Sequence, residues 1–564
     1  MEQATYEPAV GRVIGTDDAT PLEFWVAVAP GQYLQLDDVV ALERVLPGTG
    51  ELVRMYGVVS QVRARHEGAR FDSDVFLIEE GVLPAEVSEA ALVQTTRFEP
   101  EVFVPPRPGE PVLRAIGDAR DAALFFDKMR GHELPCGLSR NGEPLYVNFE
   151  FLDGTRGAHV NISGVSGVAT KTSYATFLLY GIFHSGLLGR EAHNTKALVF
   201  NVKGEDLLFL DHKNLALEPA QADRYGQLGL PLGAFESLAV WAPPRRGDAT
   251  ARPDVAGRTF GLRSFFWTLH DFCRLELLPF LFADAEDDRQ QYSLIVHNVV
   301  ARLRQATPTG EGGVSIEGIS LRTFDALVDL VNERVSDPDD DAWRGRAIGM
   351  GTANAFVRRL HSAVRHVAHL IRADVAHPDK HGVEFEEQVT VVDLHNLNDR
   401  AKRFVVGVIL RKAFDTKEQS GVARPLQFVV LDELNKYAPR EGSSPIKEIL
   451  LDLAERGRSL GIVLIGCQQT ASEVERRILA NSAIRVVGRL DPAEAGRDEY
   501  GFLSAVHRQR ATIAKPGTML VFQPELPVPL VVEFPFPAWA TRSSEAGTEW
   551  GLADLPDDPF EGLP

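Results

Sequence analysis

The stretch AHVNISGVSGVATKTSYATFLL, residues 158–179, joins an apolar run, a glycine-containing loop and a helical pattern in immediate succession. A loop between a strand and a helix turns backbone N–H groups toward one point, and the helix N-terminus adds partial positive charge. This order predicts a cradle for nucleotide phosphates, in which Lys171 supplies a mobile cation and Thr172 a hydroxyl for Mg²⁺. The predicted nucleotide-binding residues are Gly164, Val165, Gly167, Val168, Ala169, Thr170, Lys171, Thr172 and Ser173.

The spacing of this loop departs from the usual pattern G-x-x-x-x-G-K-[ST]. Gly164 stands seven residues before Lys171, and Thr170 replaces the glycine that usually precedes the lysine. The loop is therefore one residue longer than the pattern. An ordinary strand-to-helix connection is the alternative interpretation of the stretch.

A second motif, FVVLDE at residues 428–433, is an apolar strand that ends in two carboxylates. A strand buried on both faces brings such residues to the carboxyl edge of a parallel sheet, where the phosphate loop also opens. We expect Asp432 to hold Mg²⁺ and Glu433 to orient or deprotonate the attacking water. The pair of motifs together predicts an ATPase.

Polar residues after the second motif are further candidates for the chemistry. The strand at 461–469 ends in Gln468 and Gln469, and an amide there can contact both the γ-phosphate and the lytic water. Strand alternation decides which of the two points inward. Arg440, Arg456 and Arg458 follow Glu433, and one of them, with Arg458 preferred, is expected to reach a neighbouring subunit's nucleotide; helix-end surface arginines are the alternative.

Composition limits the class of protein. The chain has 564 residues, 44% hydrophobic and 24% charged, which is typical of a globular protein of several domains. No long uncharged apolar run and no signal-peptide pattern occur, and the three scattered cysteines favour a reducing cytoplasm, so we expect a cytoplasmic protein without a membrane span. The net charge of -20 disfavours nucleic-acid binding in general but leaves room for a local basic channel.

Periodicity divides the chain into five regions. Short apolar runs between turns predict a small β-barrel or sandwich over 1–105. Alternating strands and helices over 106–250 and 381–540 predict the two parts of one α/β core. Residues 251–380 have helical periodicity, and we expect an inserted helical sub-domain there, without strands from about 255 to 375. The acidic residues 541–564 are expected to form a flexible tail.

One helix of the predicted insertion, at about 352–372, carries a basic stripe. Arg358, Arg365 and Arg372 recur at seven-residue intervals, with His361 and His369 nearby. Such a stripe either contacts phosphates or forms a solvated face with salt bridges.

The order of these motifs resembles the HerA family of the HerA–FtsK superfamily. The resemblance rests on HVNISGVSGVATKTS, FNVKGEDLLFLD, VVDLHNL, VVLDELNKYAPR, RGRSLGIVLIGCQQT and QPELPVPLVVEFP, and it spans about Val10 to Pro535. It implies a RecA-like P-loop ATPase core with an N-terminal HAS-type barrel, assembled as a homohexamer that moves double-stranded DNA through a central pore.

The resemblance also implies roles and partners. Lys171 and Thr172 match the Walker A positions, Asp432 and Glu433 the Walker B positions, Gln469 the polar sensor, and Arg458 an arginine that follows Walker B. Arg156 is the nearest match to a second arginine before the Walker A strand. The implied partner is a NurA-like nuclease in DNA end resection and repair; the alternative is an anti-phage effector, such as a Sir2-like protein, gated by the ring. A motor acting on protein is a third hypothesis.

Overall fold

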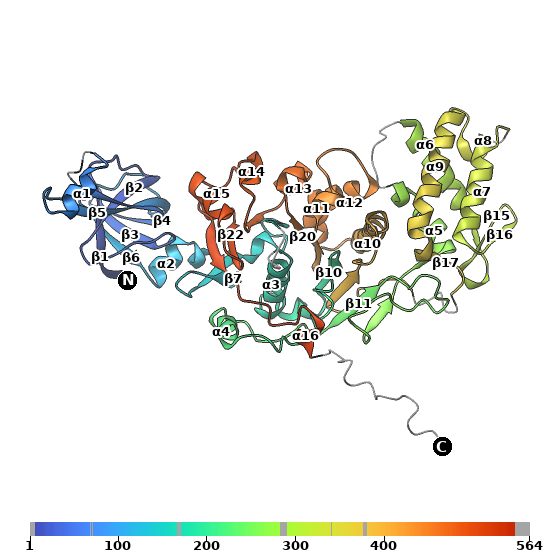
Figure 1. The fold of residues 1–564 in the computed structure, drawn as a ribbon, viewed down its shortest axis with the longest axis horizontal. Helices are drawn as coiled ribbons and strands as arrows, with labels where there is room; N and C mark the ends of the chain where they lie inside the picture. Colours follow the sequence, from blue (N-terminus) through green and yellow to red (C-terminus); the bar gives the residue numbers. More distant parts are fainter. Residues whose placement is uncertain are drawn as a thin grey trace, which may run out of the picture. The chain divides into compact units, whose positions relative to one another are not determined.

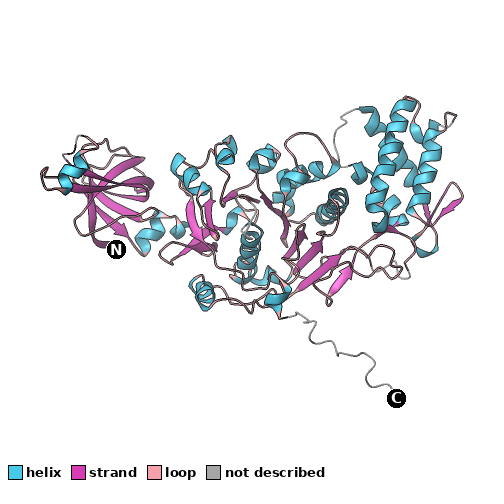
Figure 2. Cartoon of the chain, viewed as in Figure 1, coloured by secondary structure: helices cyan, strands magenta, loops and turns pink. Residues whose placement is uncertain are grey.

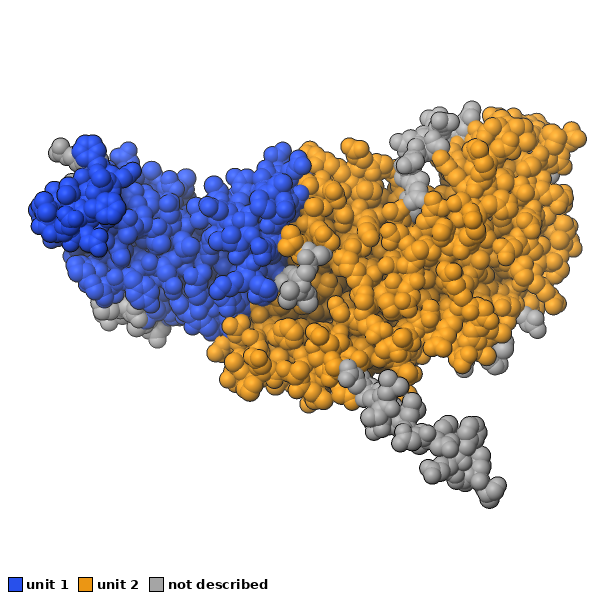
Figure 3. Space-filling view, in the orientation of Figure 1, with its two compact units in different colours: residues 1–149, 484–533 blue, residues 150–483, 534–564 orange. Residues whose placement is uncertain are grey.

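The computed structural model describes residues 6–67, 69, 71–165, 171–282, 290–339, 341–375 and 381–547. Two compact units alternate along the chain (Figure 3). The first contains residues 1–149 and 484–533, and the second contains residues 150–483 and 534–564. The sequence assigns residues 106–149 and 484–533 to the α/β core, whereas the structure groups them with the N-terminal strands.

A closed antiparallel barrel begins the first unit (Figure 1). Its strands alternate in burial, as Phe24 and Val26 show on β2, because successive side chains point to opposite faces of a strand. The predicted N-terminal β-barrel is thus confirmed. Around the barrel the strands follow the order β1 (Tyr6–Val13), β2 (Glu23–Val28), β5 (Glu86–Glu99), β4 (Leu52–Glu67), β3 (Val39–Val45) and β6 (Pro111–Ala115).

An antiparallel sheet and short helices complete the first unit. Buried Gln523 links the two chain segments: its Oε1 accepts the N–H of Asn148 at 2.9 Å, and its Nε2 donates to the carbonyl of Tyr146 at 3.2 Å. The strands are β21 (Ile484–Val487), β22 (Thr518–Phe522), β23 (Leu530–Glu533), β7 (Glu133–Leu138) and β8 (Pro144–Asn148), and the helices are α2 (Asp118–Ala123), α14 (Pro492–Ala495) and α15 (Ala505–Thr512).

The second unit is built on a parallel sheet, and Figure 2 shows helices lying against it. Its central strands are buried along their whole length, except for half-buried Lys196 at the start of β10, as expected where helices cover both faces of a sheet. The predicted α/β fold class is confirmed. The spatial order is β12 (Leu262–Ser264), β11 (Leu238–Ala242), β18 (Val389–Asp393), β10 (Lys196–Asn201), β19 (Gln427–Leu431), β20 (Ile462–Gln468) and β9 (Val160–Ser163).

The helices of this unit begin and end at residues suited to those positions. The side chains of Asn398 and Ser444 accept backbone N–H groups at the starts of α10 and α12. Gly461 ends α12 at φ 70°, and a Cβ there would lie 1.7 Å from the carbonyl oxygen of Ala423, so only glycine fits. The long helices are α3 (Lys171–His184), α10 (Asp399–Ser420) and α12 (Pro445–Leu460).

A helical sub-domain is inserted between β12 and β18, as predicted. The expectation that it lacks strands is wrong, because β14 (Thr307–Pro308), β15 (Val314–Ile316) and β16 (Ile319–Leu321) form a small sheet. Glu317 and Gly318 have positive φ and make the tight turn between β15 and β16, a signal too short for periodicity to detect. The helices are α5 (Leu269–Arg274), α6 (Gln290–Leu303), α7 (Phe324–Ser336), α8 (Asp341–Arg344) and α9 (Met350–Val367).

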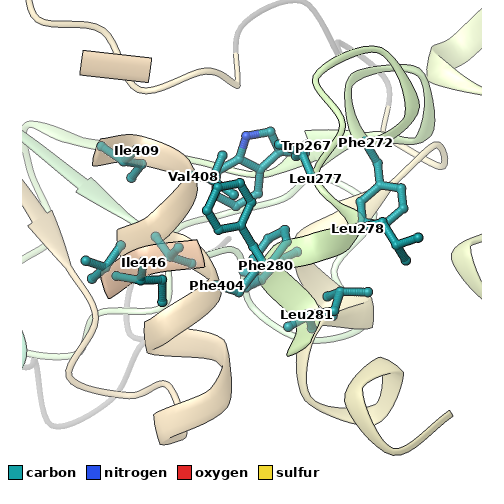
Figure 4. Packing of buried hydrophobic residues seen from close by; sticks show 14 of the residues in the cluster. Trp267, Phe272, Leu277, Leu278, Phe280, Leu281, Phe404, Val408, Ile409 and Ile446 are labelled. Carbon is teal, nitrogen blue, oxygen red and sulfur yellow. The ribbon is translucent and has the colours of Figure 1, made fainter. Parts of the chain in front are cut away.

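Aromatic packing fixes this insertion to the sheet's helices (Figure 4). Phe280 lies against Gly407 of α10, where an added Cβ would be 2.6 Å from the ring. The rings of Trp267 and Phe404 meet edge to face with centroids 5.2 Å apart. The insertion and the sheet's helices therefore share one hydrophobic core.

Part of the predicted tail is folded. Residues Ser543–Ala546 form α16, and the N–H of Leu215 donates to the carbonyl of Glu545 at 2.9 Å. Residues 548–564 lie outside the described residues. Across the described ranges, no helix combines the length and the apolar character needed to cross a membrane.

Buried His159 fixes the start of β9, the strand that leads into the predicted phosphate loop. Its Nδ1 accepts the N–H of Leu464 at 2.9 Å, and its Nε2 lies 3.2 Å from the carbonyl of Ala454, so the neutral ring carries its proton on Nε2. Burial lowers the pKa of His159 to about 4. A second proton would have to displace the bond from Leu464.

We therefore expect stability to fall on acidification. In the unfolded state His159 binds a proton below about pH 6.5, whereas in the folded state it does so only below about pH 4. The stability that His159 contributes above pH 6.5 is therefore lost as the pH falls from 6.5 to 4. The loss from this residue is about 2 kcal/mol at pH 5. Thermal unfolding of His159→Gln should show a smaller fall in Tm between pH 7.5 and 5 than the wild type. Exposed His193→Gln is the control, and an equal fall in all three proteins would contradict the assignment.

Candidate active site

The loop of the first motif connects buried β9 to α3. Gly164 and Val165 are described, whereas the predicted residues Gly167, Val168, Ala169 and Thr170 lie outside the described residues. Lys171 is the first residue of α3, with Thr172 and Ser173 next in its first turn. This is the helix end at which backbone N–H groups have no partner within the helix.

Lys171 is buried and points back along the loop. Its Nζ donates to the carbonyl oxygen of Gly164 at 2.8 Å. Burial lowers the pKa of Lys171, and the negative charge of Asp432 opposes that effect. An ammonium group carries a positive charge and three N–H donors, which suits it to bind an anion.

The two motifs meet although 260 residues separate them. The hydroxyl of Thr172 donates to Oδ2 of Asp432 at 3.4 Å, and Asp432 directly follows buried β19. The other carboxylate oxygen of Asp432 accepts the N–H of Glu433 at 2.8 Å. A hydroxyl and a carboxylate thus face one another at the carboxyl edge of the sheet.

Glu433 is held by two lysines. Its Oε1 lies 2.8 Å from Nζ of Lys203, and its Oε2 lies 2.9 Å from Nζ of Lys436 on α11 (Leu434–Tyr437). Burial acts to raise the pKa of Glu433, but hydrogen bonds and charges from both lysines outweigh it and lower the pKa. Its backbone is left-handed at φ 56°, which costs roughly 1–2 kcal/mol for a residue with a Cβ. Strain of this kind gathers at functional sites.

Neighbouring strand ends hold Lys203 in this position. Asn201, the last residue of β10, donates to Oδ1 of Asp393 at 2.8 Å, at the end of adjacent β18. Lys402 donates to the carbonyl of Val202 at 2.9 Å. The backbone on the N-terminal side of Lys203 is thereby fixed beside β19.

The two glutamines after β20 lie in different surroundings. Gln468 is fully buried, and its Nε2 donates to Asn161 at 2.8 Å and to Ser163 at 2.7 Å, both on β9. Gln469, the predicted sensor, is exposed just beyond the strand. Gln468 therefore joins β20 to the strand that precedes the phosphate loop, while Gln469 is accessible to a ligand.

Two of the predicted arginines lie at one loop. Arg458, exposed in the last turn of α12, donates to the carbonyl oxygens of Gly154 at 3.0 Å and Thr155 at 2.7 Å. Arg156, also exposed, follows in the same loop with its Nη1 3.6 Å from Glu150. The structure thus gathers Arg156 and Arg458 on the surface just before β9.

Arg440 lies elsewhere. Its backbone N–H donates to the carbonyl of Glu473 at 2.7 Å, and its guanidinium donates to the carbonyl of Ser472 at 3.1 Å. It therefore adjoins the segment that follows Gln469. The fourth arginine considered, Arg456, pairs with Glu418 on the surface.

The residues at the sheet edge fit a magnesium nucleotide. Thr172 and Asp432 supply hard oxygen ligands, and Lys171 supplies a cation beside them. No cluster of three or more His, Cys, Asp or Glu residues suited to a metal occurs among the described residues. Mg²⁺ bound with a nucleotide needs only one or two carboxylates, because phosphates and water complete its shell.

Two features of the site were not predicted from the sequence. Lys436 stands three residues after Glu433, a spacing that brings side chains together on a helix, so the sequence did contain a signal. The contacts of Gln468 with Asn161 and Ser163 depend on the register between β20 and β9. One sequence does not reveal that register.

No protein-family model matches the chain, and no curated protein matches it either. VirB4 of Thermoanaerobacter pseudethanolicus is similar in structure at 15% identity and TM-score 0.43, covering 72% of this chain and 96% of its own. Plasmid coupling protein TrwB, in complex with ADP and Mg²⁺, is similar at 10% identity and TM-score 0.44, covering 74% and 94%.

A shorter similarity is found to the genome packaging NTPase B204 from Sulfolobus turreted icosahedral virus 2, in complex with AMP. It has 14% identity and TM-score 0.21, and it covers 26% of this chain and 67% of the viral one. Because these TM-scores are below 0.5, we base the assignment of the site on its own geometry.

Proposed function

We propose that this chain is the ATPase subunit of a hexameric motor of the HerA–FtsK type that moves along double-stranded DNA. The observation that carries the proposal is the contact between Thr172 and Asp432, with Lys171 and Glu433 beside them. A cation, a hydroxyl and two carboxylates at one helix N-terminus are the groups that phosphoryl transfer to water requires.

Each of these residues has a proposed role. Lys171 binds the β- and γ-phosphates together with the N–H groups of the loop. Thr172 and Asp432 hold Mg²⁺, which neutralises charge on the phosphate oxygens when it is bound. Glu433 orients and deprotonates the lytic water, and exposed Gln469 contacts the γ-phosphate.

The lysine pair on Glu433 suggests how idle hydrolysis is limited. With both carboxylate oxygens bonded, to Lys203 and Lys436, Glu433 has weakened basicity toward water. Lys203 also lies 3.8 Å from Asp432, so it stands where the γ-phosphate would attract it. Transfer of Lys203 from Glu433 to that phosphate would free one oxygen for water.

Surface arginines support an assembly with shared sites. Arg156 and Arg458 lie together before β9, and the hydrogen bonds of Arg458 fix the loop that carries Arg156. We propose that this surface faces the nucleotide of the next subunit, where an arginine stabilises the charge that develops in transfer. The number of six subunits rests on the resemblance to HerA proteins.

A basic face in the insertion supports DNA as the substrate. Residues 342–373 contain no Asp or Glu, although the whole chain has net charge -20. Three basic residues are exposed along α9: Arg358, His361 and Arg365. Arg372, which was predicted to belong to the same stripe, is instead buried and paired with Asp374. Exposed basic side chains such as these would bind DNA phosphates, and binding to phosphates does not depend on the DNA sequence.

The partner of the ring is proposed from the resemblance alone. A NurA-like nuclease docked on the barrels would make the motor a DNA end-resection machine. An anti-phage effector on the same barrels would make the ATPase a gate for that effector.

Hydrolysis tests the site directly. Lys171→Ala should lose nucleotide binding, whereas Glu433→Gln should bind ATP and hydrolyse it at least about 100-fold more slowly, because the water lacks its base. The measurement is ATP turnover with and without linear double-stranded DNA. Lys213→Ala and Glu333→Gln alter exposed residues of the same unit and should keep full activity. Wild-type turnover in Glu433→Gln would refute its assignment as the base.

Lys203 has a distinct signature. If it moves to the γ-phosphate, Lys203→Met should weaken binding of a non-hydrolysable ATP analogue about tenfold and leave ADP binding unchanged, because ADP lacks that phosphate. Titration calorimetry measures both affinities. Equal weakening of ATP-analogue and ADP binding would indicate a general loss of site structure instead.

Mixing subunits tests the arginines. An Arg458→Ala subunit has intact Lys171, and a Lys171→Ala subunit has intact Arg458, so a mixed ring contains some complete sites if Arg458 acts on its neighbour's nucleotide. Turnover of the mixture should exceed the average of the separate variants severalfold. In the control mixture, Arg456→Ala subunits are combined with Lys171→Ala subunits. A mixture that only averages its components would exclude action across the interface.

A further inference from the structure

The hairpin of β4 and β5 extends beyond the core of the barrel. Its strands pair from Arg54 opposite Glu99 to Glu67 opposite Glu86. Met55 and Val59 on the inner half of β4 are buried, whereas none of its residues from Gln61 to Glu67 is buried. The outer half of the hairpin therefore serves a purpose other than filling the barrel.

The segment that joins the two strands exposes large apolar side chains. We call residues 71–87 the hairpin tip. Within it, Phe71 is 73% exposed, Phe76 65%, Val82 68% and Val87 62%, and Val75 and Leu77 are also exposed. Isolated exposed apolar residues are normal on a protein surface, but a group of this density marks an interaction site.

Helix α1 (Asp74–Glu79) packs little of its surface against its own chain, although Oδ2 of Asp74 accepts the N–H of Phe71 at 3.0 Å within the hairpin tip. None of its residues, all of which the structure describes, is buried, and the side chain of Ser73 makes no capping hydrogen bond. A helix of one or two turns is marginal in water unless tertiary packing stabilises it. The packing surface for Val75, Phe76 and Leu77 is therefore to be sought in another molecule.

The negative charge of the hairpin tip limits the kind of molecule that can bind it. From Phe71 to Glu89 the sequence has no Lys, Arg or His, and the basic residues paired opposite this segment are Arg65 and His66 of β4, across from Ser88 and Val87. A second copy binding through the same surface would bring like charges together, and nucleic acids and anionic membranes would also be repelled. The acidic residues around the apolar group are Asp72, Asp74, Glu79, Glu80, Glu86 and Glu89.

We propose that the hairpin tip docks a different protein, through an apolar face rimmed by Lys and Arg residues. The inference extends the proposed function by placing the partner's contact on one element of the barrel. It does not depend on ATP hydrolysis, since the barrel and the hairpin belong to the first unit. Phe71 and Phe76 are the expected anchors, because aromatic side chains dominate such contacts.

Two fluorescent amphipathic helical peptides, one of Leu and Lys and one of Leu and Glu, probe this chemistry on the full-length protein by anisotropy. The Leu/Lys peptide should bind the wild type, and the Leu/Glu peptide should not. Phe71→Ser with Phe76→Ser should weaken binding at least about tenfold. Glu79→Gln with Glu80→Gln should weaken it severalfold and reduce its salt dependence.

The matched control is Phe260→Ser, which removes a phenylalanine that is 76% exposed in the second unit. ATP turnover, measured in parallel, should be equal in all variants, so failure of the proposed ATPase is seen separately from failure of docking. Equal binding of both peptides, or unchanged affinity in the double Phe variant, would overturn the proposal. So would a smaller particle mass of that variant in light scattering, which would show that a second copy of this chain covers the tip.

Discussion

The contact between Thr172 and Asp432 is the constraint on which the proposed chemistry depends. It exists because β9 and β19 run parallel in one sheet with β20 between them, so both chains leave the sheet at the same edge. Gln468 donates hydrogen bonds to β9, and His159 donates to the carbonyl of Ala454 and accepts from the N–H of Leu464; these bonds fix the spacing of the strands. Any change that shifted one strand by a residue would turn every side chain to the opposite face and separate the two motifs.

Electrostatics around Glu433 combine two opposing demands. As the proposed general base, Glu433 should be available to water, yet its carboxylate is paired on both sides and its backbone is strained. Lys171, in contrast, directly follows the loop and is buried. Desolvation disfavours its charged form and lowers its pKa, whereas the negative charge of Asp432 favours the charged form. Because Lys203 already lies 2.8 Å from Glu433 and 3.8 Å from Asp432, the proposed transfer to an arriving phosphate requires only a short movement of its side chain.

Much of this architecture could be predicted because it follows from local patterns. The buried runs before Gly164 and Asp432 indicated parallel strands, and the turn-separated runs before residue 105 indicated the barrel. What could not be predicted depends on contacts between distant segments. The hydrogen bonds of Gln523 with Tyr146 and Asn148 place the C-terminal strands in the first unit, and nothing in either segment alone indicates that pairing. The position of Gln469 outside the strand likewise depends on where β20 ends.

The first unit is made of two segments that are far apart in the sequence, and this affects how it folds during translation. Its N-terminal portion stops at residue 149, and the strands that complete its sheet begin at Ile484, so more than three hundred residues must leave the ribosome before that sheet can close. Translation at about 5–20 residues per second makes this wait tens of seconds, during which the edge of β7 that later pairs with β23 stays unpaired. Unpaired edges invite association with other chains, so nascent copies near one another on a polysome are exposed to mispairing at this sheet.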